Sequence, residues 1–305
     1  MPRVTIAIPT FRRPRGLARL LDALEALQTK AEVRVLVADN DAEGREGLAL
    51  CQARRAQYRW PLTAVMAPER GIAQARNMLV ENALLDSDME FVAMLDDDEW
   101  PAPHWLDALL AEQAKTGADA LQGSILFDVD DDWAQSFDGI CDIRHRSGPV
   151  QMLQGAGNLL LTRAALTRLA RPWFDPAFAL TGGEDHDFFV RLKYAGMRFA
   201  WSDEAVATSA VPQARRSLGW ALSRAYSIGN SDMRVFLKHE RGLGARLREG
   251  ARTAAALLLS PLLFVILAFS ANRRADALRR LFRAFGKTAA LFGRQHHAYA
   301  ASHGD

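Results

Sequence analysis

A short apolar run that leads into four consecutive carboxylates, FVAMLDDDEW at residues 91–100, most constrains how this chain can fold. The apolar part, residues 91–95, has the composition of a buried strand. The carboxylates Asp96–Glu99 follow it directly, and like charges packed this closely repel unless a cation or hydrogen-bond donors offset the repulsion. Because ligands of open α/β sheets collect at the carboxyl ends of strands, the segment predicts a divalent metal site rather than a solvated acidic turn.

Strand-like runs alternate with helical periodicity from the N-terminus to about residue 126. This alternation is typical of a parallel, right-handed βαβ sheet with helices on both faces. No GxxxxGK[ST] or strand-linked GxGxxG is present, so the phosphate loops of kinases and dehydrogenases are excluded. The predicted strands are residues 4–8, 33–38, 62–66, 91–95 and 120–126, and the predicted helices are 15–27, 44–56, 72–85 and 103–115.

The rhythm breaks over residues 128–150, which predict a long, functional loop. Regular structure returns beyond it. The later elements are a strand and short helix beginning within 155–162, a helix at 182–195, a strand at 198–201 and a helical pattern from 213 to about 238.

The cysteines and the N-terminus favour a reducing, cytosolic setting. Cys51 and Cys141 are far apart, without CxxC spacing or histidine partners, which argues against a disulfide framework and against a zinc site. The first residues, MPRVTIAIPTF, contain only five apolar positions before Pro9 and predict a first strand rather than a signal peptide.

The C-terminal quarter differs in charge from the rest. Residues 1–233 hold 25 Lys and Arg against 32 Asp and Glu, a net charge of −7, whereas residues 234–294 hold 13 against 3, a net charge of +10. Residues 254–271 carry no charge, and Pro261 predicts a kink or break in a helix there. Arginines on both flanks of this run argue against a helix that simply crosses a membrane. We therefore expect a helical hairpin or an interfacial helix that lies in the cytoplasmic leaflet of the membrane. The alternative is an apolar helix pair packed on the main domain or in a dimer interface.

Polar residues follow several of the predicted strands. Residues 9–12 (PTFR) follow the first strand, 39–41 (DND) the second and 96–99 the fourth, while residues 71–77 (GIAQARN) open a helix. Carboxylates for a metal and for ribose or base, with an arginine at a helix N-terminus for phosphate, predict a site for a nucleoside diphosphate.

Six segments in order, VTIAIPTFRRPRGLARLLDAL, VLVADNDA, GIAQARNMLVENAL, FVAMLDDDEW, GAGNLLLTRAAL and GGEDHDFFVRLKYAG, resemble family 2 glycosyltransferases with the GT-A fold. The set is most similar to the succinoglycan-type exopolysaccharide glucosyltransferases, over about residues 3 to 230. The resemblance implies a Rossmann-like, mainly parallel sheet flanked by helices. It also implies a catalytic domain at 1–230, with a nucleotide-sugar half at 1–126 and an acceptor half at 127–230, followed by a basic helical region at 231–305.

The resemblance implies specific roles in binding a UDP-sugar. Asp96 and Asp98 match the DxD motif, with Asp98 coordinating Mg²⁺ or Mn²⁺ and Asp96 facing ribose and metal, while the role of Asp97 stays open. Asp39 would bind the uracil edge. The remaining nucleotide-sugar positions are Pro9, Thr10, Arg12, Asn40, Arg76 and Asn77.

A second carboxylate pair resembles the family's ED motif. Asp185 matches the base that deprotonates the acceptor hydroxyl, and Glu184 binds the acceptor or positions Asp185. Gly183 fits a close approach of backbone to sugar. Arg216 and Arg224 resemble a basic segment near the diphosphate or acceptor, but Ser217 replaces the family's tryptophan and so favours single addition over processive synthesis.

The expected enzyme is an inverting, metal-dependent hexosyltransferase that forms a β-linkage, with UDP-glucose as first choice of donor. The expected acceptor is a polyprenyl-diphosphate-linked or free saccharide at the inner face of the cytoplasmic membrane, where anionic lipid would hold the basic C-terminus. Few aromatics interleave with the C-terminal arginines, so nucleic acid is not an expected partner. Two alternatives remain, an inactive transferase-like membrane scaffold and a sugar-nucleotidyltransferase, although the GxGxR loop of the latter is missing.

Overall fold

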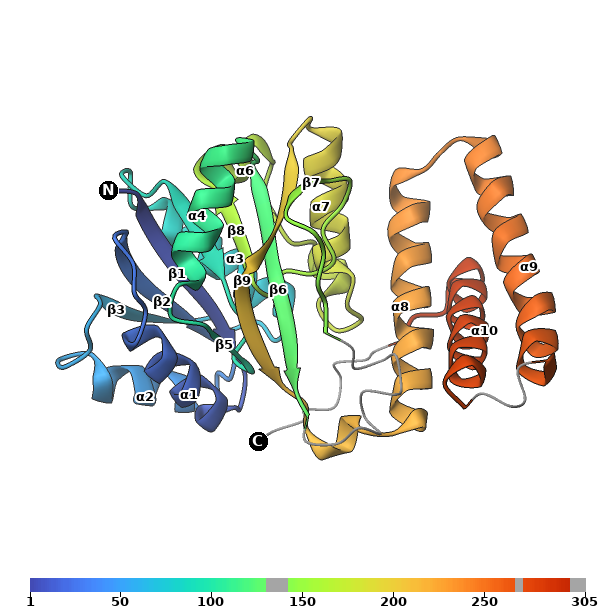
Figure 1. Ribbon diagram of the computed structural model, residues 1–305, viewed down its shortest axis with the longest axis horizontal. Coiled ribbons are helices and arrows are strands. Elements are labelled where there is room, and N and C mark those ends of the chain that lie inside the picture. Colours follow the sequence, from blue (N-terminus) through green and yellow to red (C-terminus); the bar gives the residue numbers. More distant parts are fainter. Residues whose placement is uncertain (130–141, 267–270, 297–305) are drawn as a thin grey trace.

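The fold is a mixed sheet of parallel and antiparallel strand pairs, covered by helices on both faces, with three long C-terminal helices standing to one side (Figure 1). The computed structural model describes residues 1–129, 142–266 and 271–296. The strand order is β3-β2-β1-β4-β8-β6-β9-β5, and β7 also pairs with β9. The strands are β1 (Arg3–Thr10), β2 (Glu32–Asp39), β3 (Leu62–Met66), β4 (Phe91–Met94), β5 (Glu99–Pro101), β6 (Ala120–Asp128), β7 (Gly148–Val150), β8 (Leu159–Thr162) and β9 (Phe199–Ala210).

The expected alternation of strands and helices in the first half is confirmed, with boundaries shifted by a few residues. The helix predicted at 213–238 is split into a short 3₁₀ turn, η2, and α8. The helices are α1 (Pro14–Glu25), α2 (Glu46–Arg54), α3 (Ile72–Leu84), α4 (Trp105–Thr116), α6 (Arg163–Arg168), η1 (Pro176–Phe178), α7 (Glu184–Tyr194), η2 (Gln213–Arg215), α8 (Leu218–His239), α9 (Leu243–Ile266) and α10 (Ala271–Leu291).

The sheet departs from a purely parallel order at β8. This strand lies between β4 and β6 and runs antiparallel to both. The strands β5 and β7, three residues each, also pair antiparallel with β9 and were not predicted. Part of the predicted loop at 128–150 is therefore strand β7, while residues 130–141 of that loop lie outside the described part of the chain.

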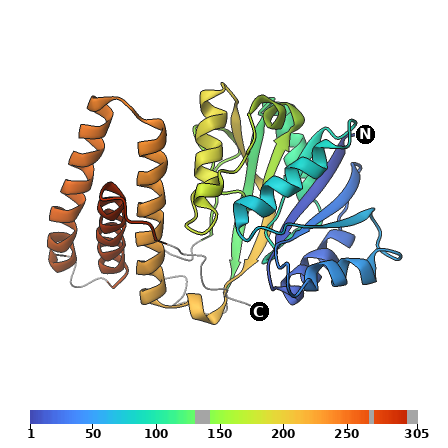
Figure 2. The same cartoon turned by 180° about the vertical axis from the view of Figure 1, so that it is seen from behind.

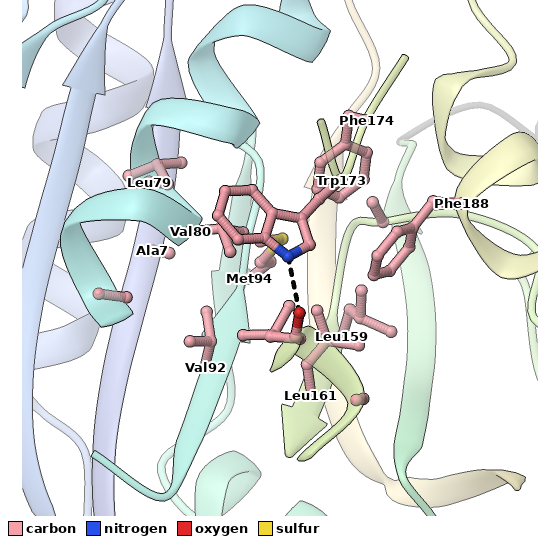
Figure 3. Close-up of a cluster of buried hydrophobic side chains, with 14 of the residues drawn as sticks. Ala7, Leu79, Val80, Val92, Met94, Leu159, Leu161, Trp173, Phe174 and Phe188 are labelled. Atoms are coloured by element: carbon pink, nitrogen blue, oxygen red, sulfur yellow. Dashed lines mark hydrogen bonds between the residues drawn. The ribbon is translucent and has the colours of Figure 1, made fainter. Parts of the chain in front are cut away.

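Two apolar layers hold the helices to the sheet. Helices α1, α2 and α4 cover one face, where Ile6, Ile8 and Val35 meet the buried leucines of α1. Helices α3, α6 and α7 cover the other (Figures 1 and 2). On this second face the indole of Trp173 is buried beside Phe174 and donates its N–H to the Leu166 carbonyl over 2.8 Å (Figure 3). Burial of such large side chains fixes the loop before α7 on the sheet.

The last three helices form a layer of their own beside α7 (Figure 1). A Cβ at Gly229 of α8 would lie 2.0 Å from the Arg283 carbonyl oxygen, and one at Gly286 of α10 would lie 2.0 Å from the Tyr226 carbonyl oxygen. The two backbones therefore cross in contact, which only glycine permits. The domain boundary expected at residue 230 falls within α8.

Helix α9 exposes apolar side chains and buries polar ones. Leu258 is 76% exposed and Val265 68%, whereas Thr253 and Ser260 are buried. Within the described residues it is the one helix long and apolar enough to cross a membrane, judged by length and composition. It continues through Pro261 to Ile266, so a break at that proline was a wrong prediction. Residues 267–270 of the uncharged run lie outside the described part.

Candidate active site

The site forms where the carboxyl ends of β1, β2 and β4 meet the N-terminal turns of α3 and α7. Parallel strands end at one edge of a sheet, so residues following different strands become neighbours. Of the predicted nucleotide residues, Pro9 and Thr10 end β1 and are buried, and Asp39 ends β2. The edge therefore gathers several of the residues that the sequence pointed to.

Arg76 joins the two acidic motifs. Its Nη2 donates to Asp96 Oδ1 over 2.9 Å, and its Nη1 donates to Glu184 Oε1 over 2.6 Å. Arg76 and Glu184 are both buried, 4% exposed each. Burial raises the pKa of Glu184 to about 7, with the neighbouring Asp185 charge adding to the effect. Asp96 and Glu184, which lie 20 and 108 positions after Arg76 in the sequence, thus share its positive charge.

Asp185 differs from Glu184 in its surroundings. Its side chain is half-buried, and its Oδ1 accepts the backbone N–H of His186 over 2.7 Å. A Cβ at Gly155 would lie 3.6 Å from Asp185 Oδ2, so glycine there keeps the space beside this oxygen open. Since Glu184 is enclosed by Arg76 and Asp185 is accessible, the geometry favours positioning for Glu184 and contact with a ligand for Asp185.

The acidic segment is held by the predicted residue Thr10 and by two arginines, Arg13 and Arg215, for which the sequence predicted no role. Arg13 Nη1 donates to Asp97 Oδ1 over 3.1 Å and to Asp98 Oδ2 over 2.7 Å, and Thr10 Oγ1 donates to Asp97 Oδ2 over 2.8 Å. Arg215 Nη1 lies 3.7 Å from Asp98 Oδ2. The only sequence signal for these arginines was their place in two Arg-Arg pairs, 12–13 and 215–216, each next to a predicted member of the site.

Burial raises the pKa values of two carboxyl groups in this segment. It raises the pKa of Asp97 to about 7 despite the nearby Arg13 charge. Burial also raises the pKa of Glu99, to which the charges of Asp96 and Asp98 contribute. Glu99 Oε2 accepts the Asp96 backbone N–H over 3.1 Å, and a Cβ at Gly157 would lie 2.5 Å from Glu99 Oε1. The fourth carboxylate is therefore an internal support of the turn.

Asp96 and Asp98 fit a divalent cation by chemistry and exposure. Their side chains are 35% and 21% exposed, and each gives one oxygen to an arginine. Hard carboxylate oxygens suit Mg²⁺ and Mn²⁺, and Mg²⁺ is commonly held by one or two carboxylates together with phosphate oxygens. Among the described residues no group of three or more His, Cys, Asp or Glu side chains converges on one point.

Several predicted site residues contact the protein's own backbone. Asp39 accepts the N–H groups of Asp41 and Leu48 over 3.0 and 2.9 Å, so a uracil contact would have to share or displace one of these bonds. Asn40 joins the Ala67 and Glu69 carbonyls to the Gly71 N–H. Both side chains therefore hold the loops that follow β2 and β3.

Asn77 exchanges two hydrogen bonds with the Phe174 backbone, over 2.7 and 2.8 Å, and the structure does not bring its side chain to the carboxylates. Arg12 is exposed, has φ of 53°, and pairs with Asp41 over 3.0 Å. Positive φ is uncommon for arginine and marks a constrained turn after β1.

The other predicted acceptor or diphosphate residues are Gly183, Arg216 and Arg224. Gly183, with φ of 98°, packs against Ser231 of α8. Arg216 Nε donates to the Val211 carbonyl over 3.1 Å, and Arg224 is exposed on α8. Arg215, the neighbour of Arg216 in the sequence, lies 3.7 Å from Asp98 Oδ2 in the acidic segment.

Comparison with known proteins identifies the relatives of this arrangement. The model of glycosyl transferase family 2 matches residues 5–149, and that of glycosyl transferase family group 2 matches residues 91–292. The succinoglycan biosynthesis protein ExoM of Rhizobium meliloti (strain 1021) is 33% identical over 95% of this chain and 93% of that protein. ExoW of the same organism is 32% identical over 44% of this chain and 38% of its own length.

Solved structures share the fold at low identity. The mannosyltransferase PcManGT from Pyrobaculum calidifontis, in complex with GDP-Man and Mn²⁺, has a TM-score of 0.63 at 20% identity, over 96% of this chain and 88% of its own. S. aureus TarS 1–349 in complex with UDP has a TM-score of 0.53 at 16% identity, over 96% of this chain and 92% of its own. The expected GT-A fold is thereby confirmed.

Proposed function

This chain belongs to glycosyl transferase family 2, and we propose that it is an inverting, metal-dependent enzyme. It moves a hexose, with glucose as first choice, from a UDP-sugar to a lipid-linked or free saccharide acceptor. The bond that it forms is a β-linkage. The relative ExoM is a succinoglycan biosynthesis protein, which supports a role in exopolysaccharide or cell-surface glycan synthesis. UDP and UDP-GlcNAc complexes of TarS support a UDP-sugar, although PcManGT is in complex with GDP-Man.

The observation that carries this proposal is the bridge made by Arg76 between Asp96 and Glu184. An inverting transferase must hold the leaving diphosphate and the attacking hydroxyl on opposite sides of one anomeric carbon. The bridge brings the motif expected to bind the donor diphosphate next to the motif expected to hold the base. The buried guanidinium group of Arg76 thus fixes the distance between the donor motif and the motif that carries the base.

In the proposed reaction Asp185 accepts the proton of the acceptor hydroxyl as that oxygen attacks the anomeric carbon. Its Oδ2 faces the space that Gly155 leaves open, and its Oδ1 is fixed by the His186 N–H. Glu184 and Arg76 hold the first turn of α7 in place. Arg13 and Arg215 lie beside Asp98, where they can balance negative charge on the leaving group.

Asp96 and Asp98 would hold Mg²⁺ or Mn²⁺, and the cation when bound supplies Lewis-acid stabilisation of the departing nucleoside diphosphate. The pair fits the cation through its oxygen chemistry and partial exposure, as described above.

The proposed place of action is the inner face of the cytoplasmic membrane. The exposed apolar side chains of α9 and the +10 charge of residues 234–294 suit an anionic lipid surface. A membrane-bound enzyme would meet a polyprenyl-diphosphate-linked acceptor in two dimensions. Deleting residues 242–305 would then release the protein from membranes, and unchanged association would contradict this placement.

The test is UDP release from a panel of UDP-sugars with Mg²⁺ or Mn²⁺ and membrane lipid extract as acceptor. Wild type is compared with Asp98→Ala, Asp185→Asn and the control Asp88→Asn, whose exposed carboxylate pairs with Arg3 before β4. We expect metal-dependent turnover that both site variants lose and the control keeps. Binding of UDP without turnover would leave the nucleotide site standing and question the acceptor. Absence of UDP binding would overturn the proposal in favour of a scaffold.

A further inference from the structure

The segment that carries Glu184 and Asp185 is fastened to helix α8, outside the catalytic sheet. The carboxylate of Asp187 is completely buried, and its Oδ1 lies 2.6 Å from Lys238 Nζ and 2.8 Å from His239 Nε2. Lys238 also pairs with Asp175 over 2.6 Å. A buried carboxylate needs such partners, so α8 is a structural requirement of the turn that begins α7.

A second set of contacts continues this connection from α10 to Asp185. Arg283 of α10 donates through Nε to Asp232 Oδ2 of α8 over 3.1 Å. Asp232 Oδ1 lies 3.2 Å from His186 Nδ1. The backbone N–H of the same histidine donates to Asp185 Oδ1 over 2.7 Å. The chain of contacts Arg283–Asp232–His186 therefore ends on the carboxylate that we propose as the base.

The crossing of α8 and α10 makes this connection stiff. The Arg283 carbonyl oxygen is the atom that a Cβ at Gly229 would approach to 2.0 Å, so the residue that binds Asp232 also belongs to the closest contact between the two helices. Close-packed interiors transmit displacements instead of absorbing them. A shift of α10 relative to α8 must therefore be felt at Asp232.

The charges along the connection support it. The hydrogen bond with Asp232 raises the pKa of His186 against the opposing effect of burial, which favours the charged imidazole facing Asp232. Asp185 acts in the same direction and Arg283 in the opposite one. Charge-assisted hydrogen bonds of this kind are stronger and more directional than neutral ones.

We propose that His186 is a positioning residue for Asp185, held by Asp232 and Arg283, so that the C-terminal helices set the geometry of the base as well as anchoring the enzyme. The inference rests on the proposed role of Asp185. It predicts that the catalytic unit extends beyond residue 230 and includes α8 and α10.

The experiment compares full-length wild type with His186→Ala, Asp232→Ala and the double variant in membranes. We expect each to lower kcat by about 10-fold or more, because small displacements of a reacting group are costly, while KM for the donor changes less than about 2-fold. The double variant should be no slower than the singles, since both break one connection. His186→Gln, which keeps an N–H donor toward Asp232, should recover most of the rate.

Lys287→Met is the matched control, because Lys287 pairs with Glu249 between α10 and α9 over 2.5 Å and this pair includes no residue of α7. It should leave kcat unchanged. Wild-type kcat in His186→Ala and Asp232→Ala, additive losses, or an equal loss in the control would each overturn the inference.

A second readout does not depend on turnover and so separates this inference from the proposed function. Hydrogen exchange of the peptide spanning residues 182–190 should become faster in His186→Ala and Asp232→Ala and stay unchanged in Lys287→Met. Unchanged exchange in the first two variants would overturn the connection even if the wild type transferred no sugar. Faster exchange in an enzyme without transferase activity would support the connection and refute only the proposed reaction.

Discussion

Replacing Asp97 by asparagine should stabilise the folded protein at alkaline pH, although Asp97 lies in the acidic segment of the site. Its side chain is 6% exposed and accepts hydrogen bonds from Thr10 and Arg13. Burial nevertheless raises the pKa of Asp97 from 3.8 to about 7. The folded state therefore holds this proton more tightly than the unfolded chain does.

The sign and size of the effect follow from linkage. Between pH 3.8 and about 7 the folded protein binds the proton and the unfolded chain does not, so the free energy of unfolding falls as pH rises through this window. Each pKa unit corresponds to about 1.4 kcal/mol, so about three units give a loss of about 4 kcal/mol above pH 7. Asparagine cannot ionise and avoids the loss. Its amide forfeits one acceptor for Arg13, at a cost of about 1 kcal/mol, which leaves a gain of about 3 kcal/mol at pH 8.

Denaturant unfolding of the two proteins at pH 5 and pH 8 measures this difference. EDTA is present, because a cation beside Asp97 would favour its ionised form. The stability difference should be near zero at pH 5 and grow by pH 8. Asp22→Asn, which removes a carboxylate 63% exposed and paired with Arg54, should change stability by less than about 0.5 kcal/mol at both pH values. An Asp97→Asn protein that is less stable than wild type at pH 8, or a difference independent of pH, would refute the reasoning.

Three further perturbations test other parts of the structure. Arg76→Ala leaves Glu184 buried without its countercharge, so it should lower the free energy of unfolding by about 3 to 5 kcal/mol and abolish UDP release. A smaller loss of stability in thermal unfolding would show that the bridge is dispensable. Gly286→Val forces α8 and α10 apart and should lower the free energy of unfolding by about 1 to 3 kcal/mol in a denaturant titration. An unchanged denaturant midpoint would contradict the close crossing of the two helices. Leu258 and Leu262 are exposed on α9, and replacing both by aspartate should abolish flotation of the protein with anionic vesicles. The melting temperature should stay within a few degrees of the wild-type value. Retained flotation would contradict the lipid contact.

Local sequence patterns were sufficient to predict the elements of the first half and the edge of the sheet at which the site forms. Strand and helix periodicities are local properties, so β1 to β4 and α1 to α4 could be predicted within a few residues. Carboxylates that follow strands of a parallel sheet must meet at one edge, so the sequence pattern predicts that Asp39 and Asp96 lie there.

The order of the strands and the partners of the site residues depend instead on contacts between segments that are far apart in the chain. The insertion of β8 between β4 and β6 depends on pairing between distant segments, which local periodicity does not encode. Asn77 turned to the Phe174 backbone, and Arg215 rather than Arg216 reached Asp98. The direction of a side chain depends on how its element is rotated against neighbours far away in the chain. The link from Arg283 through Asp232 to His186 likewise depends on how α8 and α10 pack beside α7. The sequence alone therefore did not predict it.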